Sequence, residues 1–136
     1  MFSTLFTGRL NRKQYICRYL ATIAISIIVL CIVVATSDIN WESPAESMDK
    51  LNVVPLYVLS VIANLAAFSF DLRRIHDVNL PSQLILLPII VTIASYIPFF
   101  NDGTAFYGLY AIELLFFLFL CIRKGTPGDN QYGVQP

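Results

Sequence analysis

The stretch ICRYLATIAISIIVLCIVVAT, residues 16–36, decides the class of this protein. It carries one charged residue, Arg18, near its start, and most of the rest is isoleucine, valine, leucine and alanine. At 1.5 Å per residue, a helix of about 20 residues matches the ~30 Å hydrocarbon core of a bilayer. We therefore predict a transmembrane helix. Asn11 followed by Gln14 resembles a capping box, which predicts that this helix begins near Arg12.

Three further apolar stretches are long enough to cross a bilayer, and they cover residues 53–70, 84–100 and 105–122. The first of these continues without a helix breaker until Asn79 and Pro81, so we expect its helix to project beyond the bilayer to about residue 78. In the next stretch, Pro88 predicts a kink unless a neighbouring group bonds the carbonyl that it frees. Residues 101–104 predict a tight turn between the last two helices.

Composition and charge distribution also indicate a membrane protein. The chain is 57% hydrophobic and 13% charged, which is richer in apolar residues and poorer in charge than a soluble domain. Eight of its nine Lys and Arg residues lie in three segments: Arg9, Arg12, Lys13 and Arg18, then Arg73 and Arg74, then Arg123 and Lys124. The ninth, Lys50, lies among acidic residues, namely Asp38, Glu42, Glu46 and Asp49. Four passes through a bilayer put the three basic segments on one side, as the positive-inside rule requires.

We therefore predict an all-α membrane protein with four transmembrane helices and with both the N-terminus and the C-terminus cytoplasmic. The 136 residues leave no room for a separate soluble domain, so we expect residues 1–136 to form one polytopic membrane domain. A cleaved signal peptide is the competing interpretation of the first stretch. We discount it because that stretch is longer than the 7–15 residues of a signal-peptide core and three more spans follow.

No segment carries a catalytic, metal-binding or cofactor-binding signature. Cys17, Cys31 and Cys121 lack CxxC spacing, and His76 is the single histidine. The sequence therefore predicts no metal site and no cofactor. His76 and Asp77 are adjacent, and adjacent helical residues do not face each other, so spacing alone does not make them an acid/base pair. We expect no catalytic residues, and an enzyme acting on a lipid-linked substrate is the least favoured class.

Two polar residues lie within the predicted spans. Glu113 is near the middle of the fourth, where an ionised carboxylate costs at least ~2.5 kcal/mol, and Asn64 is at a comparable depth in the second. A neutral Glu113 bonded to Asn64, or to the carbonyl freed by Pro88, would remove most of this cost. The alternative is a proton or cation site on a transport path. A structural role is favoured because a transport route usually shows more than one intramembrane ionisable group.

The remaining polar residues lie on the predicted cytoplasmic side. A helix through DLRRIHD, residues 71–77, places Asp71 near Arg74, and both Arg73 and Arg74 near Asp77, at i+3 and i+4 spacings. The polar cluster is defined as Arg9, Arg12, Arg73, Arg74, His76, Asp77, Lys124, Asn130 and Tyr132. Its cations suit contact with lipid phosphates. The alternative is a pocket in which arginines hold an anionic ligand.

The C-terminal stretch GTPGDNQYGVQP, residues 125–136, is short, turn-rich and punctuated by glycine. Tails of this kind usually fray. An alternative hypothesis is that it folds back across the cytoplasmic side, with Tyr132 packing and with Asp129 or Asn130 meeting the cations.

The cytoplasmic segments also carry a family resemblance. GRLNRKQY (residues 8–15), DLRRIHDVNLPSQL (71–84) and RKGTPGDNQYGVQP (123–136) resemble, in order and spacing, the signature blocks of the bacterial domain-of-unknown-function family 805, which are small inner-membrane proteins. Matched positions are Gly8, Arg9, Arg12, Arg73, Arg74, His76, Asp77, Lys124, Gly125, Thr126, Gly128, Asn130, Tyr132 and Gly133. Two places depart from the family pattern by lacking its tryptophan: Ile16 and Cys17, and Leu80, Pro81 and Ser82. The resemblance brings no established activity, but it implies that the three blocks belong together.

We expect a non-enzymatic component of the bacterial inner (plasma) membrane that contacts anionic lipid or a partner protein through the polar cluster. Membrane lipids are the predicted partners, association with a second copy of the chain is left open, and nothing indicates nucleic acid binding. The alternative function is a small oligomeric transporter or channel that uses Glu113 and Asn64.

Overall fold

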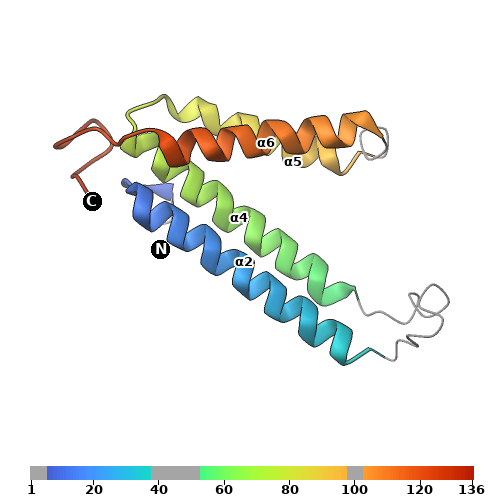
Figure 1. Cartoon of the computed structure of the whole chain (residues 1–136). Coiled ribbons are helices and arrows are strands. Elements are labelled where there is room, and N and C mark those ends of the chain that lie inside the picture. The colour runs from blue at the N-terminus through green and yellow to red at the C-terminus, as the bar shows by residue number, and fades with distance from the viewer. Residues whose placement is uncertain (1–5, 38–52, 98–102) are drawn as a thin grey trace. The chain divides into compact units, whose positions relative to one another are not determined.

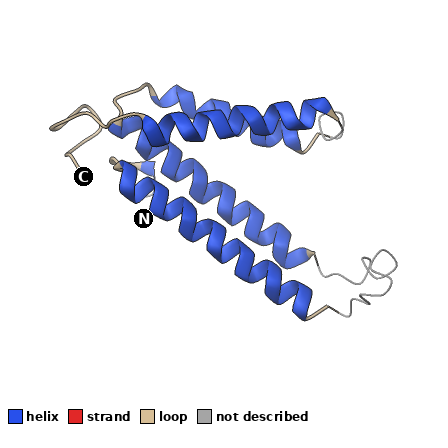
Figure 2. Cartoon of the chain, viewed as in Figure 1, coloured by secondary structure: helices blue, strands red, loops and turns tan. Residues whose placement is uncertain are grey.

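Helices account for all the regular secondary structure in the part of the chain that the computed structural model describes, residues 6–37, 53–97 and 103–136. In chain order the elements are α2 (Arg12–Ala35), α4 (Val54–Asp77), the 3₁₀ helix η2 (Ser82–Ile85), α5 (Leu86–Ser95) and α6 (Thr104–Ile122) (Figure 1). Figure 2 shows helices and loops, without a strand, in these residues. The predicted all-α class is confirmed for the described part of the chain.

The helix ends follow local signals in the sequence. Helix α2 begins at Arg12, and the backbone N–H of Gln14 donates to Oδ1 of Asn11 at 2.9 Å, which confirms the predicted cap. Helix α4 ends at Asp77. Asn79 then adopts a φ of 59°, a left-handed conformation that terminates helices and that asparagine tolerates.

Three of the helices are long and apolar enough to cross a membrane: α2 and α4 with 24 residues each and α6 with 19. The third predicted span corresponds to η2 and α5, which together form a shorter apolar helix, Ser82–Ser95. Residues 96 and 97 of that span follow the end of α5 without being helical. Its last residues, 98–100, part of the predicted turn and the acidic segment 38–52 lie outside the described residues. The structure therefore supports three helices of spanning length and a shorter fourth.

Pro88, for which a kink was predicted, lies just after a change in helix type. The backbone is a 3₁₀ helix from Ser82 to Ile85 and an α-helix from Leu86. Pro88 therefore lies in the first turn of α5, where a residue without a backbone N–H is tolerated.

The chain divides into two compact units, one formed by Met1–Cys17 and Ala67–Pro136 and the other by Arg18–Ala66. In the Arg18–Ala66 unit, large apolar side chains such as Leu20, Ile28 and Val61 are more than half exposed. Long helices that expose this much apolar surface need apolar surroundings, which a bilayer supplies.

The other unit holds the largest fully buried side chains. They are Leu10, Tyr15, Arg74, Ile75 and Leu120, which come from the start of α2 and the residue segment before it, the end of α4, and the end of α6. Helices α5 and α6 lie side by side in this unit (Figure 1). An arginine is thus a central member of the core, and the reason lies in the contacts it makes.

Candidate functional site

Asp77, the last residue of α4, is the centre of a buried ionic network. Its Oδ1 lies 3.0 Å from Nη2 of Arg9, and its Oδ2 is paired with Nη1 of Arg74. Its backbone carbonyl accepts the N–H of Thr126 at 2.8 Å and the hydroxyl of the same residue at 3.0 Å. One residue therefore joins the end of α4 to the segment before α2 and to the C-terminal tail.

Arg9 fastens the tail. Its Nη1 donates to the carbonyl of Gly128 at 2.5 Å, and its Nη2 donates to the carbonyl of Thr126 at 2.6 Å. The guanidinium also donates from Nε to Asp77 at 3.2 Å, so all three nitrogens of its side chain are engaged. A buried charge is tolerated when it is paired and its hydrogen bonds are satisfied in this way.

Arg74 has no exposed surface and joins three segments. Besides its ion pair with Asp77, its Nε donates to the carbonyl of Leu120 at 3.0 Å and its Nη1 to the carbonyl of Leu10 at 3.2 Å. Its Nη2 donates to the carbonyl of Arg123. The last carbonyls of a helix lack hydrogen-bond donors within the helix and carry partial negative charge. The Arg74 guanidinium at the end of α6 supplies both the donors and the positive charge.

Gly125 is where the tail passes closest to this network. A Cβ atom at this position would lie 2.8 Å from Cγ of Asp77, closer than carbon atoms pack. The backbone can pass here because glycine has no side chain. The residue type at 125 is therefore fixed by the carboxylate beside it.

His76 and Tyr132 form a second contact between α4 and the tail. Their rings stack with centroids 4.0 Å apart and an interplanar angle of 7°. The Tyr132 hydroxyl donates to the carbonyl of Leu80 at 3.0 Å, and Nδ2 of Asn130 donates to the carbonyl of His76 at 2.9 Å. The tail is folded against the end of α4, with Tyr132 packed as the hypothesis expects, but Asn130 bonds the carbonyl of His76 rather than a cation.

Both ring nitrogens of His76 are engaged. Nδ1 lies 3.2 Å from the carbonyl oxygen of Gly8, and because a carbonyl only accepts, Nδ1 carries the proton. In the neutral ring Nε2 then accepts, and the Ser82 hydroxyl lies 2.9 Å from it. The histidine is held in one tautomer by the loops on either side of it.

The end of α4 is also held from α2. The hydroxyl of Tyr15 donates to Oδ1 of Asp71 at 2.8 Å, and both side chains are buried. The backbone N–H of Leu10 donates to the carbonyl of Arg73 at 3.0 Å. Of the same-helix pairs predicted for DLRRIHD, the pair between Arg74 and Asp77 is an ion pair.

The polar cluster predicted from the sequence thus has an inner part and a rim. Arg9, Arg74, His76, Asp77, Asn130 and Tyr132 are linked through the contacts described above, and Arg73 contributes its carbonyl. Arg12 and Lys124 are exposed. Arg12 reaches the carbonyl of Ile122 at 3.5 Å.

Sequence reasoning assigned no contact with Asp77 or His76 to four residues of the site: Tyr15, Ser82, Gly125 and Thr126. The available signal was their position inside the three blocks, because Gly125 and Thr126 match the family pattern. Helical periodicity does not pair them with Asp77 or His76, since their partners come from other segments.

The two predicted intramembrane polar residues have separate partners. Oε1 of Glu113, on α6, accepts from the hydroxyl of Thr92 on α5 at 3.4 Å, a contact that the sequence reasoning did not name. Nδ2 of Asn64 donates to the carbonyl of Ser60 one turn earlier in α4, at 2.8 Å.

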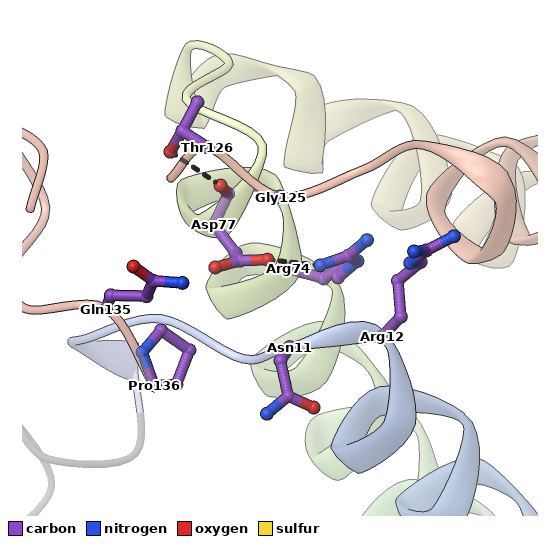
Figure 3. A pocket seen from close by; sticks show the side chains of 8 residues that line it. All are labelled: Asn11, Arg12, Arg74, Asp77, Gly125, Thr126, Gln135 and Pro136. Atoms are coloured by element: carbon purple, nitrogen blue, oxygen red, sulfur yellow. Dashed lines mark hydrogen bonds and ion pairs between the residues drawn. The ribbon is translucent and has the colours of Figure 1, made fainter. Parts of the chain in front are cut away.

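A pocket of about 190 Å³ lies beside the Asp77 network. Its lining residues are Asn11, Arg12, Arg74, Asp77, Gly125, Thr126, Gln135 and Pro136, which Figure 3 shows around the opening. Among the described residues, no group of three His, Cys, Asp or Glu side chains gathers where it could hold a metal ion. The polar groups of the pocket are instead guanidinium, carboxylate, amide and hydroxyl.

A family model described as protein of unknown function (DUF805) matches residues 3–134, nearly the whole chain. No curated protein matches the chain, and no solved structure does. The matched region includes the residues that build the Asp77 network and the stacked ring pair, and the pocket-lining residues other than Gln135 and Pro136. The chain therefore belongs to the DUF805 family.

Proposed function

We propose that this protein is a non-enzymatic, multi-pass component of the bacterial inner membrane whose polar cluster forms a folded cytoplasmic face that contacts anionic lipid headgroups. The apolar surface of α2, α4 and α6 supports the membrane assignment, and the distribution of basic residues along the chain supports the orientation.

The main support for this proposal is that some charged side chains are buried and paired with one another, whereas others are exposed. Arg9, Arg74 and Asp77 are buried and satisfy one another, with one positive charge in excess. Four cations of the same unit remain exposed: Arg12, Lys13, Arg123 and Lys124. Among the described Asp and Glu residues of this unit, Asp129 is the exposed one. Each cation close to an anionic leaflet adds about 1 kcal/mol to membrane attraction.

The hydrogen bonds of Asp77 and His76 support a non-enzymatic role. A general base needs a lone pair within reach of a substrate proton. Both oxygens of Asp77 face guanidinium groups, and both nitrogens of His76 are hydrogen-bonded within the fold. Asp77 and His76 therefore have a structural role, which is to hold the segments of the cytoplasmic face together.

The alternative function, an oligomeric transporter that uses Glu113 and Asn64, has less support because each residue already has a partner, in Thr92 and Ser60. Proton or ion flux into proteoliposomes tests it with Glu113→Gln. A wild-type flux that Glu113→Gln abolishes would establish transport and remove the purely lipid-contacting role.

The lipid proposal is tested by native mass spectrometry of protein purified in a mild detergent from membranes that contain phosphatidylglycerol and phosphatidylethanolamine. We expect the wild type to retain phosphatidylglycerol preferentially, and a variant with glutamine at positions 12, 13, 123 and 124 to lose that preference. Lys50→Gln is the control because the charge pattern puts Lys50 on the opposite side. A preference that survives the fourfold neutralisation contradicts the proposal.

Orientation is tested separately. A fluorescent protein fused after Pro136 should fluoresce and alkaline phosphatase fused there should be inactive, because fluorescence requires folding in the cytoplasm and the phosphatase requires export. The opposite pair of results would overturn the cytoplasmic assignment.

A further inference from the structure

The pocket beside Asp77 has features that the internal network does not explain, and they point to a ligand. We propose that this pocket binds one phosphate group, with Arg12 as the side chain that recognises it. This proposal rests on the proposed function, which puts the pocket at the membrane surface. It assigns the binding of anionic groups to a defined site, in place of a general attraction between exposed cations and the membrane.

Charge is the first argument. Asp77 is the carboxylate side chain that lines the pocket, and its two oxygens are already paired with Arg9 and Arg74. That trio carries one excess positive charge, and Arg12 at the pocket wall adds another. Fixed positive charge around a concave, partly desolvated space attracts an anion more strongly than the same charges spread over an open surface.

Arg12 is the cation with hydrogen-bonding capacity to spare. All three nitrogens of Arg9 and of Arg74 donate within the fold. Among the described residues, Arg12 makes one hydrogen bond, a long one of 3.5 Å from Nη1 to the carbonyl of Ile122. The other edge of its guanidinium remains available, and that planar fork matches two oxygens of a phosphate.

The two amide side chains of the pocket are both oriented as donors. Oδ1 of Asn11 accepts the backbone N–H of Gln14 at 2.9 Å, and Oε1 of Gln135 accepts the backbone N–H of Gly128 at 2.7 Å. A backbone N–H can only donate, so the oxygen of each amide must face it. Each NH₂ group is therefore left to donate. Figure 3 shows Gln135 to the left of Asp77 with its amide nitrogen directed into the pocket, which suits an acceptor-rich ligand such as phosphate, and Asn11 below Asp77 with its amide directed away from it.

The size of the pocket favours a single small group. Its volume of about 190 Å³ is below the ~300–1,000 Å³ of sites that enclose drug-sized ligands. A phosphate with a few waters fits, since one liquid water takes ~30 Å³. The phosphate is either the headgroup of a lipid or a free anion, and the chemistry of recognition is the same for both.

The test uses the full chain in nanodiscs of phosphatidylcholine, a zwitterionic lipid. One arm titrates inorganic phosphate and measures heat, and the other incorporates phosphatidylglycerol and measures retained lipid by native mass spectrometry. The variants are Arg12→Gln, Arg12→Lys and Lys13→Gln. Lys13 is the matched control because it is the adjacent exposed cation and does not line the pocket.

We expect Arg12→Gln to weaken binding about tenfold, the size of one lost charge-assisted interaction. Lys13→Gln should remove only the diffuse attraction of one exposed cation, so its loss should be the smaller of the two in both arms. Arg12→Lys should also weaken binding, because lysine keeps the charge but loses the fork. Heat from inorganic phosphate would identify the pocket as a free-anion site. Retention confined to phosphatidylglycerol would identify it as a headgroup site.

Two results would overturn the pocket. Equal losses of lipid in Arg12→Gln and Lys13→Gln would leave only diffuse attraction, so the proposed function would survive without the site. Binding of neither probe by the wild type would remove both. Circular dichroism of each variant checks that the helices are retained. We expect them to be retained in the Arg12 variants, because the Arg12 side chain is exposed.

Discussion

In the Arg18–Ala66 unit, Leu20 and Ile28 expose more than half of their surface, whereas in the other unit Leu10 and Arg74 expose none. The first unit meets its surroundings with interchangeable apolar side chains, for which lipid is as good a neighbour as protein. The second relies on individual atoms, since each nitrogen of Arg74 has its own acceptor. The Arg18–Ala66 unit should therefore tolerate the exchange of one apolar residue for another at most positions. In the other unit, the effect of a substitution should depend on the contacts of the particular residue.

Among the substitutions that test this difference between the units, Asp77→Ala should reduce stability the most. It leaves the guanidiniums of Arg9 and Arg74 buried without a counter-charge, which costs about 3–5 kcal/mol. We expect a large fall in the unfolding temperature of the detergent-purified protein. Asp129→Asn is the matched control, because that carboxylate is exposed, and it should change the temperature little. Similar effects in both variants would contradict the central place of Asp77.

Next in size is Gly125→Ala. The added methyl would lie 2.8 Å from Cγ of Asp77, and overpacking of this kind costs about 1–3 kcal/mol. Gly108→Ala, in α6, provides the comparison because a Cβ there meets nothing within 4 Å. Thermal unfolding should show destabilisation at 125 and none at 108, where alanine is the better helix former. Equal stability of the two variants would mean that the tail does not pack against Asp77.

A smaller effect is expected for Tyr132→Ala, which removes the ring stacked on His76 and the hydrogen bond to Leu80. The loss should be about 1–2 kcal/mol. It should be seen as faster proteolysis of the tail, with the helices intact. Tyr107→Ala, an exposed tyrosine of α6, should leave the proteolysis rate unchanged. A tail that is cleaved at the same rate with and without the Tyr132 ring would show that stacking does not hold it.

Ile28→Ala tests the same comparison in the Arg18–Ala66 unit. Its side chain is 57% exposed, so the change exchanges one exposed apolar group for a smaller one. We expect almost no shift in the unfolding temperature. Leu10→Ala, at a fully buried position, should lower it clearly because it opens a cavity. Equal sensitivity of the two positions would erase the distinction between the units.

What could be predicted from the sequence was local. The start of α2 follows from the Asn11 cap, and the end of α4 follows from Asn79 and Pro81, because a helix end is decided by the few residues around it. The ion pair between Arg74 and Asp77 follows from i+3 spacing on one helix. Of the third predicted span, residues 84–95 are helical, while residues 98–100 lie outside the described residues.

The site itself required the folded chain. Arg9 and Asp77 are 68 positions apart, and no periodicity links residues in different segments. The need for glycine at 125 arises from a carboxylate delivered by another helix. Family resemblance could place the three blocks together, but it could not say that Arg9 and Arg74 would be buried while Arg12 would stay at the pocket wall.

The bond between Arg9 and the tail also sets an order of events during biosynthesis. Arg9 precedes its acceptor on Thr126 by 117 residues. Helices α2, α4, α5 and α6 lie between the two residues, so all four are synthesised before this hydrogen bond can form. A chain that stops before Thr126 leaves Arg9 without the carbonyls of Thr126 and Gly128.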